Sequence, residues 1–281
     1  MTTSAASEPG RYRGPSAIGE DLRRFWSLTF TLAATDFKLR FFGSALGYLW
    51  SLIRPLLLFG VLYVVFTEII RFGAGVPHYP VYLLASLVIF TFFSETTSRG
   101  LTSLVDRENL LRKIRFPRLV IPLSVSLHAL FNLTLNLIVV FVFVIGSGIG
   151  PRLEWLELPV LLLFLVVFST GVTMLLSALF VRFRDIEPIW EVVLQLLFYG
   201  SPVLYVITTV PESVRELAAM NPIAVVLTQM RHAVIDPSAP TAAAAVGGAE
   251  WLLVPLAIVA AVFAIGAWTF ARETPRIAEN L

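Results

Sequence analysis

The sequence contains no cysteine among its 281 residues, and only 14% of its residues are charged. Without cysteine the chain can form no disulfide, no thiolate nucleophile and no Cys-based zinc site. A hydrophobic fraction of 57% and a mean hydropathy of +0.82 are incompatible with the mixed surface of a soluble domain. The composition therefore predicts an integral membrane protein, while its redox compartment stays open.

Two sequence motifs are also missing. The chain lacks the pattern G-x-x-x-x-G-K-[ST], the loop with which many ATPases hold phosphates through backbone amides. Its first twenty residues contain no apolar stretch of the kind that a cleavable signal peptide needs. We therefore expect no ATP hydrolysis in this chain and an N-terminus that stays in the cytoplasm. The net charge of +2 gives no reason to expect nucleic-acid binding.

Long apolar stretches are abundant. A helical span needs roughly 20 mostly apolar residues, and six stretches meet this requirement. An even number of spans would put both termini on the same side of the membrane. The predicted fold is therefore all-α with six transmembrane helices, over residues 50–70, 79–98, 119–145, 158–181, 188–207 and 251–271.

Lys and Arg are distributed unevenly between the two sides of these spans. Sixteen of the 21 lie in the terminal segments and in the loops at 99–118 and 182–187, against four on the other side. Arg54 lies at the boundary. Because basic residues are enriched in cytoplasmic loops, we predict that the unstructured segment 1–20 and the tail 272–281 are both cytoplasmic.

A surface-lying helix is predicted over residues 21–42, before the first span. Lys38 and Arg40 end this helix, and Arg54 lies about one turn inside the span. Each alone reads as an ordinary positive-inside anchor. Together they form a candidate cationic collar for an anionic lipid head group such as a diphosphate. The predicted apolar face of the helix, typical of an interfacial helix, comprises Leu22, Trp26, Phe30, Ala33, Phe37 and Phe41.

Two spans carry a polar residue at every fourth position. In the third span the favoured interpretation is hydrogen bonding between helices. In the fifth span Glu191 is ionisable, and for it a structural salt bridge and the lining of a channel are equal alternatives. The two stripes comprise Ser124, His128, Asn132 and Asn136, and Glu187, Glu191, Gln195 and Tyr199.

The loop after the second span is helical in pattern from about Thr102 to Ile114 and carries charges of both signs. One interpretation is a solvated loop helix. The alternative is a docking helix for a cytoplasmic partner, in which charges around a thin apolar edge fix the register.

Three segments together resemble a known family. They are "RFFGSALGYLWSLIRPLL" (40–57), "ENLLRKIRFPRLVIPLS" (108–124) and "YGSPVLYVITTVPESVRELAAMNPIAVVLTQMRHAVI" (199–235). In this order they resemble the signatures of ABC-2-type permeases that export bacterial polysaccharides, a family that includes O-antigen, teichoic acid and mycobacterial galactan exporters. The composition, rich in Ala, Val and Arg, favours galactan among these substrates.

The resemblance implies a single permease domain over 50–271 in the bacterial inner membrane. The chain would form a homodimer with two cytoplasmic ABC ATPase subunits, which would bind ATP and Mg, and it would hold no cofactor, metal or catalytic residue itself. The implied substrate is a polysaccharide on a polyprenyl diphosphate, and 202–235 would form external re-entrant helices. A coupling helix over 103–115 would contact the ATPase through Ser103, Asp106, Arg107, Glu108, Leu111, Arg112, Lys113 and Arg115.

Aromatic residues are candidates for the wall of the export path. An aromatic ring offers an apolar face along which a sugar chain can slide without directional bonds that would trap it. The residues chosen as channel lining are Phe59, Tyr63, Glu191, Gln195 and Tyr199, and those chosen for the lipid diphosphate are Lys38, Arg40 and Arg54.

Three other functions compete with this interpretation. An ABC-2 exporter of drugs or small lipids would share the fold. A membrane enzyme acting on lipid-linked sugars would need placed carboxylates, and the candidates, Asp185 with Glu187 and Asp106 with Glu108, are equally well explained as loop salt bridges. A secondary transporter would need repeated broken helices, and no internal repeat is visible between the halves of the sequence.

Overall fold

All regular elements that the structure describes are helices, which confirms the predicted all-α membrane class. The structure is a computed structural model and describes residues 22–41, 47, 49–71, 73, 75–108, 110 and 117–273. The elements are α1 (Leu22–Phe41), α2 (Leu49–Tyr63), η1 (Val64–Ile69), α3 (Tyr79–Asp106), α5 (Val120–Gly146), η2 (Leu153–Leu156), α6 (Glu157–Phe180), α7 (Ile186–Gly200), η3 (Ile207–Thr209), α8 (Glu212–Ala219), α9 (Pro222–Met230), η4 (Arg231–Ile235), α10 (Ala242–Ala245), η5 (Ala249–Leu252) and α11 (Leu253–Glu273).

Five helices in the described ranges are long and apolar enough to cross a membrane. Four of them begin and end within about five residues of the prediction. The exception is α3, which continues to Asp106 instead of ending near Ser98. A salt bridge between Glu95 and Arg99, one turn apart, and a hydrogen bond from Thr102 to Asp106 tie successive turns of this extension together. The five spans are Leu49–Ile69, Tyr79–Asp106, Val120–Gly146, Leu153–Phe180 and Ala249–Glu273.

The remaining predicted span, 188–207, forms a shorter helix. α7 has 15 residues, Ile186–Gly200, which at 1.5 Å per residue cover about 22 Å of a hydrocarbon core about 30 Å thick. The helix ends because Ser201 adopts an extended backbone (φ −101°, ψ 153°) before Pro202, a residue that cannot continue a helix. The count of six full spans therefore stays a prediction.

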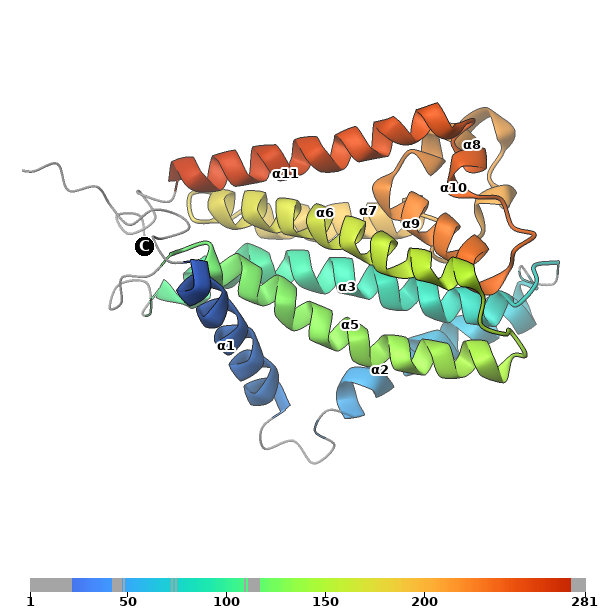
Figure 1. The fold of residues 1–281 in the computed structure, drawn as a ribbon, viewed down its shortest axis with the longest axis horizontal. Helices are drawn as coiled ribbons and strands as arrows, with labels where there is room; N and C mark the ends of the chain where they lie inside the picture. Colours follow the sequence, from blue (N-terminus) through green and yellow to red (C-terminus); the bar gives the residue numbers. More distant parts are fainter. Residues whose placement is uncertain are drawn as a thin grey trace, which may run out of the picture.

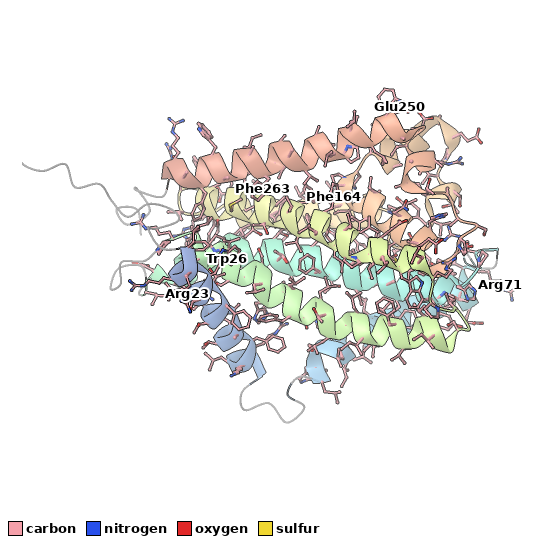
Figure 2. The ribbon with its side chains drawn as sticks, in the orientation of Figure 1. Arg23, Trp26, Arg71, Phe164, Glu250 and Phe263 are labelled. Carbon is pink, nitrogen blue, oxygen red and sulfur yellow. The ribbon has the colours of Figure 1, made fainter. Side chains whose placement is uncertain are left out.

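The long helices run side by side along the longest axis of the molecule (Figure 1). α3 packs between α5 and α6, and α11 packs on α6 at the edge of the bundle. The described ends of the chain, the start of α1 and the end of α11, lie at the same end of the bundle, whereas α8, α9 and α10 gather at the opposite end. Figure 2 shows Arg23 and Trp26 at the first end and Arg71 and Glu250 at the second.

α3 forms the centre of the bundle, and most of its apolar window is buried. Tyr79 and Tyr82 lie at its start and are almost fully buried. The Tyr79 hydroxyl donates to the carbonyl of Leu204 at 2.6 Å, and the Tyr82 hydroxyl donates to the carbonyls of Pro202 and Tyr205. These bonds satisfy carbonyls of the segment that follows α7, so they fix the chain where it leaves this helix.

α6 and α11 approach each other closely through glycines. A Cβ built on Gly171 of α6 would lie 2.7 Å from the Cα of Phe263 in α11, which Figure 2 labels between the two helices. A Cβ built on Gly266 would overlap the carbonyl oxygen of Gly171. Small residues allow such close backbone packing between membrane helices, so this pair sets the distance between α6 and α11.

α1 crosses the bundle at an angle and packs against α5 (Figure 1). Its buried face is formed by Phe25, Thr29 and Ala33, whereas Trp26 and Phe30 are more than half exposed. Of the predicted apolar face, Ala33 is buried in the bundle and Phe30 contacts Phe131 of α5, with ring centroids 5.7 Å apart. The exposed stripe remains available to lipid, and the interfacial location of α1 stays a prediction.

The short helices α8, α9 and η4 form a cap within 202–235, where short helices were predicted. Arg231 and Asp236 form a buried ion pair there at 3.0 Å, and the Arg231 guanidinium lies 5.8 Å from the ring centroid of Tyr82. Burial alone would raise the pKa of Asp236. The hydrogen bonds from Ser238 and the charge of Arg231 outweigh burial and hold that pKa below its ordinary value.

Substitution of Gly266 by Ala should destabilise the protein by about 1–3 kcal/mol, because the added methyl group forces α6 and α11 apart. Gly60→Ala in α2 is the matched control, since a Cβ there meets nothing within 4 Å. We expect that control to leave the melting temperature in detergent unchanged or slightly raised. Equal melting temperatures for the two variants would contradict the close contact.

Replacement of Asp236 by Asn should lower the free energy of unfolding at pH 7, because Arg231 then lies buried without its countercharge. Since the pKa of Asp236 is lowered in the folded state, its contribution is present above the unfolded pKa of about 3.9 and is lost as the pH falls through the folded value. The stability difference between parent and variant should therefore shrink below about pH 4. A difference that does not change between pH 7 and pH 3 would argue against the ion pair.

Candidate functional site

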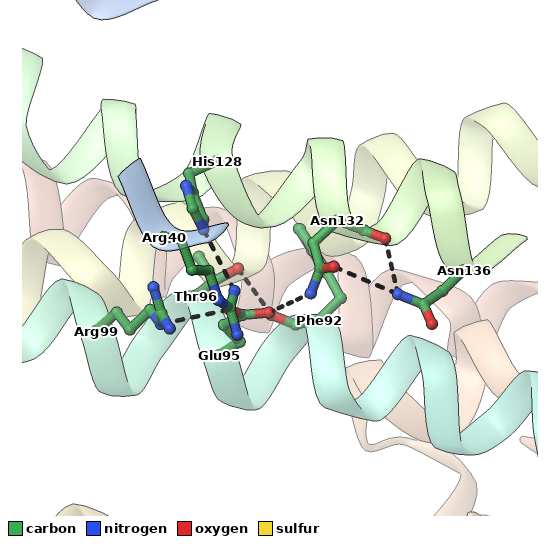
Figure 3. A network of polar contacts seen from close by, with 8 residues as sticks. All are labelled: Arg40, Phe92, Glu95, Thr96, Arg99, His128, Asn132 and Asn136. Atoms are coloured by element: carbon green, nitrogen blue, oxygen red, sulfur yellow. Dashed lines mark hydrogen bonds and ion pairs between the residues drawn. The ribbon is translucent and has the colours of Figure 1, made fainter. Parts of the chain in front are cut away.

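A charged network lies between α1, α3 and α5, with Glu95 at its centre (Figure 3). The Glu95 side chain is only 10% exposed. It accepts a hydrogen bond from the Arg40 guanidinium of α1, a second from Asn132 of α5 at 2.7 Å, and pairs with Arg99 one turn further along α3 at 3.3 Å. A carboxylate within an apolar helix needs such partners, because an isolated charge there is costly.

The polar stripe of α5 faces this network. His128 Nε2 lies 3.3 Å from the Arg40 guanidinium, and since a guanidinium only donates, Nε2 is the unprotonated, accepting nitrogen. Asn136 donates to the backbone carbonyl of Asn132 at 2.9 Å. The Ser124 hydroxyl accepts from Arg107 at 3.0 Å. The interpretation of His128, Asn132 and Asn136 as interhelical hydrogen-bonding residues is thus confirmed for His128 and Asn132, whereas Asn136 bonds within α5.

A second ion pair holds the other contact between α1 and α3. Arg107, directly after α3, pairs with Asp36 of α1. Asp36 and Arg40 are four residues apart and thus on one face of α1. This face is therefore attached to α3 by two ion pairs of opposite polarity, in which α1 supplies the acid of one and the base of the other.

A pocket of about 460 Å³ opens between the three helices beside this network. It lies towards the end of α3 and the start of α5, which is the end of the bundle where the described chain begins and ends. Eight of the ten residues that line it are polar or charged, and charges of both signs are present. It is lined by Asp36, Leu39, Arg40, Arg99, Thr102, Ser103, Asp106, Arg107, Val125 and His128.

The three residues predicted to meet a lipid diphosphate lie in different surroundings. Arg40 lines the pocket and is paired with Glu95. Arg54 is an exposed residue of α2 that acts electrostatically on Arg99. Lys38 is exposed and is not among the described residues that line this pocket. The structure therefore associates Arg40 and Arg54 with Arg99, which the sequence prediction did not include.

Sequence reasoning also missed Glu95. The residue lies inside the predicted second span, where an ionisable side chain points to a functional or paired site. Arg99 follows at four residues, a spacing that places both charges on one helix face. These two signals were sufficient to identify the pair. The partners from α1 and α5 could not be identified, because nothing in the sequence shows which helix faces meet.

The predicted channel residues lie on two separate helices. Phe59 and Tyr63 of α2 are partly buried and contact each other, with ring centroids 5.8 Å apart, and Phe59 also contacts Phe143 of α5 at 6.0 Å. On α7 the residues are exposed along one side. Tyr199, at its end, is 62% exposed. The exposed α7 stripe comprises Glu187, Glu191, Gln195 and Tyr199.

The predicted coupling segment, 103–115, is described only in part. Ser103 and Asp106 belong to the last turn of α3, so this segment begins as a continuation of the long helix. Arg107 and Glu108 follow it directly. The role of the segment in docking an ATPase stays a prediction. Four of its candidate residues lie outside the described ranges: Leu111, Arg112, Lys113 and Arg115.

Comparison with known proteins identifies the family. A family model described as "ABC-2 type transporter" matches residues 27–235. The chain belongs to the ABC-2 type transporter family. The matched region runs from α1 to η4, so it contains the complete network around Glu95. α11 lies beyond the match, although it packs on α6 through the glycine contact.

Several ABC-2 relatives align over most of their length. The chain is 34% identical to the "O-antigen export system permease protein RfbA" of Klebsiella pneumoniae, over 75% of this chain and 81% of that protein. It is 32% identical to a protein of the same name from Myxococcus xanthus, over 79% and 85%. It is also 21% identical to the "Polysialic acid transport protein KpsM" of Escherichia coli, over 71% and 78%.

Replacement of Glu95 by Ala should destabilise the ABC-2 chain by about 3 kcal/mol, because Arg40 and Arg99 then lose their shared counterion in a largely buried position. The control is Glu212→Gln, which removes a carboxylate that is 91% exposed and 4.0 Å from Arg215. Such a surface pair contributes about 0–1 kcal/mol. Unfolding in mixed micelles measures both effects, and a similar small loss for both variants would show that the Glu95 network contributes little.

Proposed function

We propose that this chain is the membrane permease of an ATP-driven exporter that moves a lipid-linked polysaccharide out of the cytoplasm. The observation that carries the proposal is the alignment with permeases named for O-antigen export, which covers over four fifths of their length. The polyprenyl diphosphate carrier and galactan as the glycan are finer parts of the proposal. ATP and Mg would be bound by separate ATPase subunits.

The arrangement of charge supports a cytoplasmic uptake site. Arg40 of α1 and Arg99 of α3 pair with one carboxylate, Glu95, and Arg54 of α2 acts electrostatically on Arg99. Guanidinium groups bind phosphate oxygens through paired, charge-assisted hydrogen bonds. The diphosphate head group would therefore bind in the pocket between α1, α3 and α5, while its lipid tail stays in the bilayer beside the exposed surface of α2.

The orientation follows from the same distribution. The described ends of the chain lie at the end of the bundle that holds this pocket, together with Arg107 and Arg118. Because basic residues mark the cytoplasmic side, this end would face the cytoplasm in the bacterial inner membrane. The opposite end of the bundle, where α8, α9 and α10 gather, would then lie on the outer side of the membrane.

The exposed stripe of α7 supports a path shared by two copies. Two carboxylates, Glu187 and Glu191, and Gln195 would be costly against lipid. A second copy of the chain facing this stripe would enclose it as a water-filled path for the glycan. Tyr199 and the α2 aromatics Phe59 and Tyr63 would supply rings to the wall of such a path. ATP hydrolysis in the docked subunits would then drive rigid-body motion of the helices through 103–115.

Depletion of the protein in its native host should cause one diphosphate-linked glycan to accumulate on the cytoplasmic side, because synthesis continues while export stops. Mass profiling of lipid-linked glycans from both sides of the membrane measures this effect and identifies the glycan. Complementation with Arg99→Gln should restore export poorly, by about tenfold less than the parent. Arg71→Gln at the opposite end is the control with the same change in net charge and should restore it fully.

An unchanged glycan profile after depletion would contradict the polysaccharide substrate. The family assignment would persist, and an ABC-2 exporter of drugs or small lipids would then be the better account.

A further inference from the structure

We propose that Glu95 is an internal competitor for the substrate's anionic head group, a residue that determines when the pocket accepts a diphosphate. In the empty permease Glu95 neutralises Arg40 and Arg99. An arriving diphosphate takes over these arginines and thereby weakens the attachment of α1. The inference rests on the proposed function, since it assumes that an anionic lipid head group enters the pocket.

The first argument is the balance of charge around Glu95. One carboxylate is shared by Arg40 and Arg99, and Arg54 adds a third positive charge close to Arg99. Asp36 also acts electrostatically on Arg99, but its ion pair is with Arg107, so it offsets only part of this excess. A diphosphate offers more charge and more acceptor oxygens than a carboxylate, so it can satisfy several guanidinium groups at once.

The second argument is access. Arg40 and Arg99 both line the 460 Å³ pocket, and the Arg99 side chain is 46% exposed. Glu95 is not among the described residues that line this pocket and instead adjoins a small inner cavity beside Asn132. An anion that enters through the pocket therefore meets the two arginines before it meets the carboxylate. Asp106, at the exposed edge, accepts a hydrogen bond from Thr102.

The third argument is that Glu95 keeps a hydrogen-bond partner after Arg40 has moved to the diphosphate. Its second oxygen accepts from Asn132 at 2.7 Å, on the side away from Arg40. A small inner cavity of about 10 Å³ adjoins Glu95, Asn132 and Asn136, which is room for about one water molecule. The carboxylate can therefore release Arg40 without becoming an unpaired buried charge, the condition that would otherwise forbid the exchange.

The consequence concerns α1. Two ion pairs, Arg40 with Glu95 and Asp36 with Arg107, attach this helix to α3. When Arg40 leaves Glu95, only the ion pair between Asp36 and Arg107 still attaches α1 to the end of α3. Binding of the head group therefore shifts the position of α1 relative to α5. A ligand can shift such an equilibrium only through a difference in affinity for the two positions, and transfer of Arg40 from Glu95 to the diphosphate supplies that difference.

Binding of radiolabelled polyprenyl diphosphate to the full-length chain in neutral phosphatidylcholine nanodiscs tests the inference. Glu95→Gln keeps the shape and the acceptor for Asn132 but removes the competing charge. We expect it to bind the diphosphate about tenfold more tightly than the parent, while binding of uncharged polyprenol is unchanged. Inorganic pyrophosphate should displace the labelled lipid from both proteins, which separates recognition of the head group from recognition of the tail.

Two failures are distinguishable. If the parent binds the diphosphate and Glu95→Gln binds it equally or less tightly, Glu95 is a brace for the arginines and the inference is overturned, while the uptake site stands. If neither protein prefers polyprenyl diphosphate over polyprenol, the proposed uptake site itself is wrong. Glu212→Gln, at the opposite end of the bundle, controls for a general change in charge and should bind like the parent.

The distance between two spin labels, placed at the exposed positions Trp26 of α1 and Ile138 of α5, tests the movement of α1 independently. In the parent, the distance between them should change when polyprenyl diphosphate is added, and in Glu95→Gln the changed distance should be present without lipid. A distance that stays constant while lipid binds would overturn the release of α1. Should Glu95→Gln not fold, Glu95→Asp keeps the charge but shortens its reach to Arg40, and an affinity no greater than that of the parent would overturn the competition.

Discussion

A carboxylate inside an apolar helix must be neutralised, and the end of the bundle where the described chain begins and ends is arranged around that requirement. Glu95 lies in α3, the most buried of the described spans. Its partners come from its own helix, from α5 and from α1. Because Arg40 and Arg99 contact one carboxylate oxygen and Asn132 donates to the other, the charge ties three helices together at one point.

This constraint explains why α1 crosses the bundle where it does. The helix buries few apolar side chains, and its most apolar stripe faces outward. Its position is set by packing against α5, where Phe37 contacts Phe131, and by the ion pairs of Arg40 with Glu95 and of Asp36 with Arg107. A competing charge can release an ion pair, whereas it cannot release close packing. The contact between Gly171 of α6 and Gly266 of α11 is of the second kind.

The two halves of the bundle thus differ in what holds them. At the end with the cap, tyrosine hydroxyls, the buried pair of Arg231 and Asp236 and apolar packing of α9 form a contact set within the protein. At the other end, arginines exceed carboxylates around Glu95 and a pocket remains open. Among the described residues, the charges that line this pocket lie at this end.

Much of the fold could be predicted from sequence, since long apolar runs identify spans without knowledge of their packing. The extension of α3 to Asp106 was missed because charged residues beyond Ser98 lower the apolar signal, although charges one turn apart favour a helix. Hydropathy identified the apolar residues of α1, but it could not show which of them pack against the bundle and which remain exposed.

The candidate site was predicted in part. Arg40 was identified from its position at the end of α1 and the α5 stripe from its spacing, and the preference for hydrogen bonding between helices was correct for two of the three residues that it covered, His128 and Asn132. Glu95 and Arg99 were overlooked inside an apolar stretch. Their connection with Arg40 depends on a contact between residues 55 positions apart, which the periodicity of one helix cannot show.

A double-mutant cycle between Arg40 and Glu95 tests the central claim most directly. The free energy of unfolding is measured in mixed micelles for the parent, Arg40→Gln, Glu95→Gln and the double variant. The account predicts a coupling energy of about 2 kcal/mol, because each single substitution leaves the other charge without its partner. A coupling energy near zero would show that the two side chains act independently, and the Glu95 network would then not be what attaches α1 to the bundle.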